Sequence, residues 1–319
     1  MNKFIEVKNL QKYFDVPAGK LHAVDHLNFY IEKGETLGVV GESGCGKSTL
    51  GRVLLHLLDS TGGQILYQGE DVTKVRRKQL SALRKEMQIM FQDPFSSLNP
   101  RMTVYQTIAE PMRIAGGYKD IDNRVYEMMD TVGLARRLVN TYPHELDGGR
   151  RQRIGIARAL ILQPKFIVCD EPVSALDVSI QAQIINLLLD IQVKMGLTYL
   201  FITHDLMVVR YISNRIMVMY LGQMVELAKA DELFQHQLHP YTQALISAVP
   251  VPDPDMPRNR IMLKGELTSP INPAPGCRFA ARCHYCKEIC IKTTPPLREV
   301  RTDHMVACHF AEQIEKAGN

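Results

Sequence analysis

The chain has 319 residues, 45% of them hydrophobic and 23% charged, which is ordinary for a globular protein with a sizeable core. Its formal net charge of +4 is small for this length and does not favour a nucleic-acid binder. No apolar run approaches the roughly 18 residues needed to span a bilayer, and the first residues contain no apolar signal region. We therefore expect a cytoplasmic protein, with docking on a membrane protein left open.

Apolar, β-type runs alternate with helical patterns along the chain. Strands are predicted at residues 4–7, 23–31, 36–40, 65–67, 87–91, 166–169, 199–203, 215–219 and 223–226. Helical patterns fill residues 76–86 and the block from 93 to about 162, most clearly at 103–115 and 122–132. Such alternation is typical of an α/β fold with a mostly parallel sheet covered by helices. The helical block is interpreted as an inserted subdomain.

The character of the sequence changes after about residue 231, where proline-rich stretches precede a group of cysteines. We therefore predict two domains, an α/β core at residues 1–235 and a C-terminal extension at residues 236–319. Five of the seven cysteines lie between Cys277 and Cys308. In a chain without a secretion signal, this clustering favours a metal or cluster site over disulfides.

A glycine-rich loop with a lysine follows the predicted strand at 36–40. Residues 41–49 read Gly-Glu-Ser-Gly-Cys-Gly-Lys-Ser-Thr, a complete phosphate-binding motif that leads into a helical pattern. Glycines let successive N–H groups face an anion, and the helix adds its positive N-terminal end. Lys47 can reach the outer phosphates, and the Ser48 hydroxyl is placed to bind Mg²⁺. We predict a nucleoside triphosphate site at Gly41, Ser43, Gly44, Cys45, Gly46, Lys47, Ser48 and Thr49.

Two carboxylates follow the apolar strand at residues 166–169. Asp170 is expected to hold Mg²⁺, directly or through water, opposite Ser48. Glu171 is expected to polarise a water molecule aimed at the γ-phosphate. The alternative is a strand followed by a helix-capping acid. The complete phosphate loop upstream favours the catalytic interpretation.

Polar residues also follow two other predicted strands. His204 comes after the strand at 199–203, in the usual ligand crevice of a doubly wound sheet, and is expected to hydrogen-bond the γ-phosphate or the attacking water. Gln92 ends the strand at 87–91 and is the remaining candidate for contacting Mg²⁺ and water.

With these motifs in this order, the chain resembles the ATP-binding subunit of an ABC transporter, most of all the ATPases of oligopeptide, dipeptide and nickel importers. The resemblance covers nearly the whole chain. It implies a P-loop ATPase core with a small antiparallel β-subdomain, the inserted helical subdomain and a cysteine-containing extension. In the terms of this family, residues 41–49 are the Walker A loop and 168–171 end the Walker B strand. Gln92 is the Q-loop glutamine and His204 the switch histidine.

The resemblance assigns further positions. Ser174 and Asp177 belong to the D-loop, and Tyr13 matches the aromatic residue that stacks on adenine, although it could also be an ordinary surface tyrosine. Three segments are particular to the peptide group. They are Asp-Pro-Phe-Ser-Ser-Leu-Asn-Pro at 93–100, His-Pro-Tyr-Thr at 239–242 and Ser-Pro-Ile-Asn-Pro at 269–273.

The resemblance also implies partners and a location. Two ATPases would face each other head to tail under two transmembrane permease subunits, fed by an extracytoplasmic solute-binding protein, at the cytoplasmic face of the membrane. Closure on ATP and opening after hydrolysis would drive transport. The cargo would be dipeptides or oligopeptides, with nickel complexes as an alternative. A soluble ABC ATPase that acts on nucleic acid or the ribosome, and a non-transport regulator, are less favoured readings.

The signature motif departs from the Leu-Ser-Gly-Gly-Gln of the family. Here the segment reads Leu-Asp-Gly-Gly-Arg, with Asp147, Gly148, Gly149 and Arg150. A carboxylate cannot donate a hydrogen bond to the γ-phosphate bound by the partner ATPase, and at about 4 Å and an effective dielectric near 20 each unit-charge pair repels by ~4 kcal/mol. Asp147 can equally cap a helix, and Arg150 or Arg151 can neutralise part of its charge. We therefore expect a heterodimer in which the site completed by Asp147 is weak or silent.

The spacing Cys277-x5-Cys283-x6-Cys290-x17-Cys308 is similar to a four-cysteine pattern in peptide-importer ATPases, some of which bind a 4Fe-4S cluster. Four thiolates suit either iron–sulfur or zinc. We favour the cluster, with a structural role, and leave zinc or no metal open. Cys286 is interpreted as a bystander. His284, His304 and His309 lie nearby and are interpreted as ordinary loop residues.

Overall fold

The structure, a computed structural model, describes residues 3–92, 97–249, 260–265 and 269–318. The chain forms two compact units, each made of several segments. The first unit contains the chain up to Phe4, Ile31–Thr36 and Lys74–Ile202. The second unit contains Ile5–Tyr30, Leu37–Thr73 and the chain from Thr203 onward. Each unit is described by itself.

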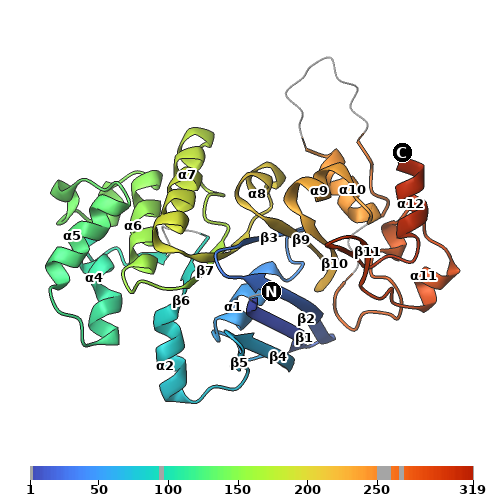
Figure 1. Cartoon of the computed structure of the whole chain (residues 1–319), viewed down its shortest axis with the longest axis horizontal. Coiled ribbons are helices and arrows are strands. Elements are labelled where there is room, and N and C mark those ends of the chain that lie inside the picture. Colours follow the sequence, from blue (N-terminus) through green and yellow to red (C-terminus); the bar gives the residue numbers. More distant parts are fainter. Residues whose placement is uncertain (1–2, 93–96, 250–259, 266–268, 319) are drawn as a thin grey trace. The chain divides into compact units, whose positions relative to one another are not determined.

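The first unit combines parallel strands with a group of helices (Figure 1). Its strands are β6 (Met87–Met90), β7 (Phe166–Asp170) and β8 (Thr198–Ile202), and β7 pairs in parallel with both neighbours. Its helices are α2 (Arg77–Glu86), α4 (Val104–Ala115), α5 (Ile121–Thr131), α6 (Gly148–Leu160) and α7 (Val178–Met195), with 3-10 turns at Arg136–Leu138 and Pro143–Glu145. Helices α4, α5 and α6 pack against one another, and α6 also contacts β6 and α7. Every residue of β7 and β8 is buried, as expected for parallel strands covered on both faces.

The second unit holds two groups of strands. The first is β1 (Lys3–Val16), β2 (Gly19–Glu32), β4 (Gly62–Tyr67) and β5 (Glu70–Asp71), in the order β2-β1-β4-β5 with β4 antiparallel to both neighbours. The second is β3 (Thr36–Val40), β9 (Arg215–Tyr220), β10 (Gln223–Lys229), β12 (His304–Val306) and β11 (Arg298–Arg301). In it β3 and β9 are parallel, and the following pairs are antiparallel.

The helices of the second unit are short and follow its strands. They are α1 (Lys47–Leu54), α8 (Leu206–Ile212), α9 (Ala230–Gln235), α10 (Pro240–Ser247), α11 (Glu288–Lys292) and α12 (Ala311–Gly318), with a 3-10 turn at Ala280–Arg282. Its core gathers buried side chains from β3, β9, β10 and α8–α10 around Tyr241 and Phe279. The C-terminal extension therefore contributes side chains to this core.

The predicted α/β fold is confirmed, including the mostly parallel sheet, the helical block and the antiparallel β-subdomain. Three strands were not predicted, namely the two-residue β5 and, in the C-terminal extension, β11 and β12. The pairing of β12 with β10 joins residues on either side of the predicted boundary at residue 235. That division into two domains stays a prediction.

Candidate functional site

The phosphate loop lies between the end of β3 and the start of α1, as its sequence predicts. Gly46 is the N-cap of α1 with φ +104°, and a Cβ there would lie 1.9 Å from the carbonyl oxygen of Ala23. Gly41 has φ +153°, and its Cβ would lie 2.2 Å from the carbonyl oxygen of Met219. No other residue fits these two positions, because a side chain would collide with backbone that cannot move aside.

Lys47 is the first residue of α1, and its side chain turns back into the loop. Its ammonium group donates to the carbonyl oxygens of Gly41 at 2.8 Å and Glu42 at 3.0 Å, and only 5% of the residue is exposed. Cys45 is buried beside it, and burial raises the pKa of the Cys45 thiol although Lys47 opposes the shift. Cys45 is therefore a packing residue of the loop, while Lys47 supplies a fixed positive charge at the helix N-terminus.

Tyr13, expected at the adenine, is half-buried in β1. Its hydroxyl donates to the carboxylate of Asp25, and its ring stacks on His22 with centroids 3.9 Å apart. Burial and the hydrogen bond to Asp25 both raise the pKa of the Tyr13 hydroxyl. The buried Arg278 guanidinium forms an ion pair with the same carboxylate. Burial alone would raise the pKa of Asp25, but its bonds to Tyr13 and Arg278 hold that pKa below its usual value.

Two carboxylates lie at the end of β7. Asp170 ends the strand and is 3% exposed. The next residue, Glu171, has φ +50°, and its N–H donates to the carbonyl oxygen of Ile202 at 2.9 Å. The Gln92 side-chain amide donates to a carboxylate oxygen of Glu171 at 3.0 Å. The structure thus brings together two residues that the sequence places 79 positions apart and predicts for the same chemistry.

The D-loop continues from this carboxylate. The Ser174 hydroxyl donates to the carbonyl oxygen of Glu171 at 3.1 Å. Asp177 is the N-cap of α7, where its carboxylate accepts the N–H of Ile180 at 2.9 Å. The loop is therefore held at both ends, by the backbone of Glu171 and by a helix cap.

The altered signature segment also begins a helix. Asp147 is the N-cap of α6 and accepts the N–H of Arg150 at 2.8 Å, while the Arg150 guanidinium lies 3.2 Å from its second carboxylate oxygen. Arg151 turns away and donates to the carbonyl oxygen of Pro143 at 2.7 Å. Of the two arginines considered for neutralising Asp147, Arg150 forms an ion pair with it.

The two glycines after Asp147 allow the start of α6 to pack closely against α7 and the D-loop. A Cβ on Gly149 would lie 2.8 Å from Cγ2 of Ile180, in the first turn of α7. A Cβ on Gly148 would lie 3.3 Å from Cδ2 of Leu176 in the D-loop. The starts of α6 and α7 are therefore in contact, so the signature segment packs directly against the D-loop.

His204 is exposed, between β8 and α8. The next residue, Asp205, is the N-cap of α8 and accepts the N–H groups of Met207 and Val208 at 2.9 and 3.2 Å. His204 belongs to the same unit as Lys47 and Ser48, whereas Gln92, Asp170, Glu171, Asp147 and Asp177 belong to the other unit. The predicted Mg²⁺ site, with Ser48 opposite Asp170, stays a prediction.

The motifs particular to the peptide group have mainly structural contacts. His239 caps α10 and accepts the N–H of Tyr241 at 3.1 Å, and complete burial lowers the pKa of His239 to about 3. In the third motif, the Asn272 side-chain oxygen accepts the N–H of Lys20 at 2.9 Å. In the first motif, residues 93–96 lie outside the described part of the chain.

All seven cysteines carry free thiols. Burial raises the pKa of Cys277 to about 12 and that of Cys283 to about 11, and neighbouring thiols add to both shifts. The thiols that act on Cys277 are those of Cys283, Cys290 and Cys308, the predicted ligand set. Nevertheless, within residues 3–92, 97–249, 260–265 and 269–318, no three His, Cys, Asp or Glu side chains are arranged to hold a metal ion. The thiols as they lie do not form a metal centre, so the structure does not support the predicted 4Fe-4S or zinc site.

The three nearby histidines each have another partner. His304 is fully buried and bonds to Glu226 at 2.7 Å, while His284 and His309 contact the carbonyl oxygens of Met262 and Thr293 at 3.0 and 2.9 Å. His304 is thus part of the core, and the expectation of an ordinary loop residue is wrong for it.

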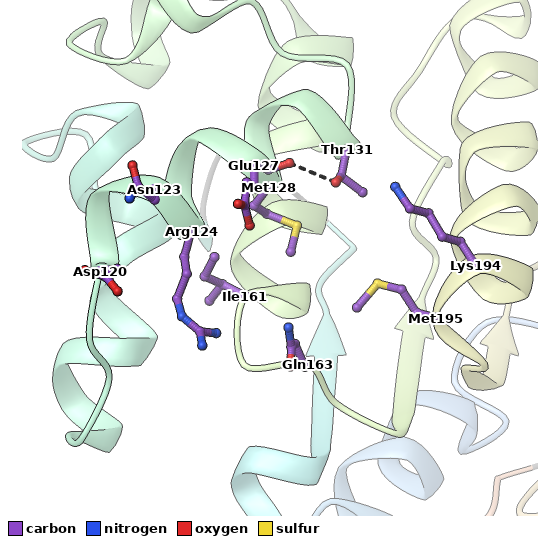
Figure 2. A pocket seen from close by; sticks show the side chains of 10 residues that line it. All are labelled: Asp120, Asn123, Arg124, Glu127, Met128, Thr131, Ile161, Gln163, Lys194 and Met195. Atoms are coloured by element: carbon purple, nitrogen blue, oxygen red, sulfur yellow. Dashed lines mark hydrogen bonds between the residues drawn. The ribbon is translucent and has the colours of Figure 1, made fainter.

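A pocket of about 470 Å³ lies in the first unit (Figure 2). Its lining comes from α5, the residues after α6 and the end of α7, with Arg124 and Lys194 among the charged groups. None of the predicted site residues lines it. The described part of the chain has no helix that is both long and apolar enough to cross a membrane.

Comparison with known proteins identifies the family. Residues 24–174 match a family model described as ABC transporter, and residues 225–290 match one described as oligopeptide/dipeptide transporter, C-terminal region. The putative oligopeptide transport ATP-binding protein YkfD of Bacillus subtilis (strain 168) is 50% identical over 319 residues, covering 98% of this chain and 96% of the relative. The oligopeptide transport ATP-binding protein OppF of Salmonella typhimurium is 51% identical over 318 residues, covering 95% of each.

Solved structures agree with this. CbiO1 from Clostridium perfringens, part of the ABC transporter complex cbiONQ, has a TM-score of 0.66 and 28% identity, covering 74% of this chain and 92% of that chain. The ATP-binding cassette MJ0796, in a dimeric post-hydrolysis state with ADP and Pi, has a TM-score of 0.65 and 28% identity, covering 71% and 98%. The chain belongs to the family of ABC transporter ATP-binding proteins, in its oligopeptide/dipeptide group.

Proposed function

We propose that this chain is the ATP-hydrolysing motor of an importer for dipeptides or oligopeptides, bound to permease subunits at the cytoplasmic face of the membrane. The observation that carries the catalytic part is the 3.0 Å hydrogen bond from Gln92 to Glu171, directly after the buried Asp170. A surface acid that merely capped a helix would not need this partner. The peptide cargo is supported by the relatives' names and by the match of residues 225–290.

The residues divide the work of hydrolysis between them. Lys47 presents a fixed positive charge to the outer phosphates. Glu171 accepts the proton of the attacking water, and Gln92 keeps the carboxylate in one orientation. Mg²⁺, when bound with ATP, neutralises developing charge on the phosphates, and Ser48 and Asp170 are the residues that would hold it.

The test of this function is reconstitution. The chain is co-expressed with candidate permease subunits, purified from membranes and placed in liposomes with a solute-binding protein. Labelled dipeptide or oligopeptide accumulates only with ATP if the proposal is correct. Stimulation by a nickel complex and not by peptides would favour the alternative cargo, and recovery with ribosomes or DNA instead of the membrane fraction would exclude a transport motor.

We further propose that the working dimer is a heterodimer with unequal sites. The reason is Asp147, which puts a carboxylate where the γ-phosphate bound by the partner ATPase is expected. Arg150 lies 3.2 Å from that carboxylate and offsets part of the repulsion, but it does not supply the hydroxyl donor that a serine has. The site completed by this chain is therefore weak, while the site built on Lys47 and Glu171 is the active one.

Replacing Asp147 with serine tests this asymmetry. Because serine caps a helix as well as aspartate, we expect α6 to keep its start, and the rate of ATP hydrolysis of the assembled pair to rise by up to about twofold as a second site becomes active. Asp147→Asn is the matched variant, since it keeps the cap and removes only the charge. Initial-rate measurements on the complete complex decide the matter, and unchanged rates for both variants would contradict the asymmetry.

The cysteine group is proposed to take up an iron–sulfur cluster, with zinc as the alternative. Neighbouring thiols add to the raised pKa values of Cys277 and Cys283, which supports the proximity of the group, although the thiols are not arranged as ligands here. We expect about four iron atoms per chain after anaerobic purification, lost in Cys283→Ser and retained in Cys286→Ser. Preparations without iron and without visible absorption would exclude the cluster, and zinc in them would support the alternative.

A further inference from the structure

Glu42, the second residue of the phosphate loop, is held from two directions by the C-terminal part of the chain. Its backbone N–H donates to the Tyr241 hydroxyl at 2.8 Å. Its carboxylate is gripped by the Arg282 guanidinium, with one nitrogen 3.0 and 2.9 Å from the two oxygens. The main chain of Glu42 is therefore held by a residue 199 positions away in sequence, and its side chain by one 240 positions away.

The two residues that grip Glu42 are themselves held rigidly. Tyr241 is fully buried in the first turn of α10, and Arg282 ends the 3-10 turn just before Cys283 with 11% of its side chain exposed. The Tyr241 and Phe279 rings each pack edge-on against the Tyr220 ring, with centroids 4.7 and 5.3 Å apart. They also pack against each other in a tilted arrangement, with centroids 5.5 Å apart. This aromatic cluster leaves the Tyr241 hydroxyl, which accepts the Glu42 N–H, little freedom to move.

The segment Arg278–Arg282 also connects to Tyr13, through Asp25. Arg278, four residues before Arg282, forms a buried ion pair with Asp25, whose carboxylate accepts the Tyr13 hydroxyl. The same guanidinium donates to the carbonyl oxygen of Leu221. The segment Arg278–Arg282 thus contacts the phosphate loop through Arg282 and is linked to Tyr13 through the Asp25 carboxylate.

We propose that the segment Arg278–Arg282, with Tyr241, is a positioning element that sets the affinity of this chain for ATP. Arg282 acts through Glu42 by neutralising a carboxylate that would otherwise face the triphosphate, and by holding the loop in its binding conformation. Preorganised loops bind more tightly because less ordering remains to be done on binding. The proposal rests on the ATP site assigned above and adds a role for the His-Pro-Tyr-Thr motif, which that site alone does not explain.

Arg282→Ala in the full-length chain is the test, with the permease complex used for turnover. We expect KM and the dissociation constant for ATP to rise about tenfold while kcat stays within about twofold, since the chemistry at Glu171 is untouched. Arg282→Lys keeps the charge and is expected to restore most of the affinity. Tyr241→Phe removes the hydroxyl that accepts the Glu42 N–H and is expected to weaken ATP binding without changing kcat. It also serves if Arg282→Ala does not fold.

The matched control is Arg301→Ala. Arg301 lies in the same C-terminal region, and its ion pairs are with Glu232 at 2.7 Å and Glu315 at 2.5 Å, none of them in the loop. Its KM for ATP should be that of wild type. A double-mutant cycle adds a further check, because Arg282→Ala should have a much smaller effect on KM in the E42Q background if Arg282 acts through that carboxylate.

The outcomes separate this proposal from the ATPase assignment. A wild-type chain that binds no ATP would overturn the assigned site. A wild-type chain that binds ATP normally, with Arg282→Ala and Tyr241→Phe both binding equally well, would overturn the positioning role alone. Additive effects of Arg282→Ala and Glu42→Gln would also contradict it, because independent residues do not share one interaction.

Discussion

Glu171→Gln is expected to lower the turnover number for ATP hydrolysis by about 10²–10⁴-fold, the usual contribution of a general base, while ATP affinity stays near wild type. Glutamine has the same shape, so it can keep the φ of +50° and accept the Gln92 amide at its carbonyl oxygen. It cannot accept a proton from water at neutral pH, and only that function is lost. Single-turnover hydrolysis and ATP binding measured on the same assembled complex separate the two effects.

Glu86→Gln is the matched control for this variant. Glu86 belongs to the same unit, and its carboxylate pairs with Lys165 at 3.1 Å on the surface, where such pairs contribute little. Its turnover should be that of wild type. If Glu171→Gln also retained turnover near wild type, this chain would not carry the working half-site, and the asymmetry proposed for the dimer would have to be reversed.

The fold was predictable where burial leaves a simple pattern. Strands β7 and β8 are buried at every residue, and both appear in the sequence as short apolar runs. Strand β11 did not, because Arg298–Arg301 is charged and only partly buried and pairs with β12 at the end of its sheet. Nothing in such a short, polar segment distinguishes a strand from a loop until its partner is known.

Some contacts of the site could likewise be predicted from the sequence, and others could not. Lys47 and Glu171 follow from local motifs, since the strand–loop–helix context fixes where their backbones lie. The bond between Asp147 and Arg150 was within reach of the sequence, because residues three apart meet at a helix start. The grip of Arg282 and Tyr241 on Glu42 was not, because it depends on how the C-terminal extension folds back, which no local pattern encodes.

Lys47→Ala is expected to weaken ATP binding by roughly 100-fold or more, equivalent to about 2.7 kcal/mol, and to abolish peptide uptake. The Lys47 ammonium donates to two loop carbonyl oxygens, and the residue is 5% exposed, so its charge acts on phosphates with little screening by water. The substitution also leaves the carbonyl oxygens of Gly41 and Glu42 without this donor, which loosens the loop. Calorimetric titration with ATP and Mg²⁺ measures the affinity, and labelled peptide accumulation in cells measures the consequence.

Lys229→Ala is the control for the loss of a lysine in the same unit. Lys229 lies on the surface and pairs with Asp303 at 3.1 Å, so its removal should change neither ATP affinity nor uptake. Since Lys47 lies on α1 and not at its cap, and alanine is a good helix former, Lys47→Ala should keep the helix. A folded Lys47→Ala chain that bound ATP within threefold of wild type would show that the loop amides suffice, and the central role given to Lys47 would be wrong.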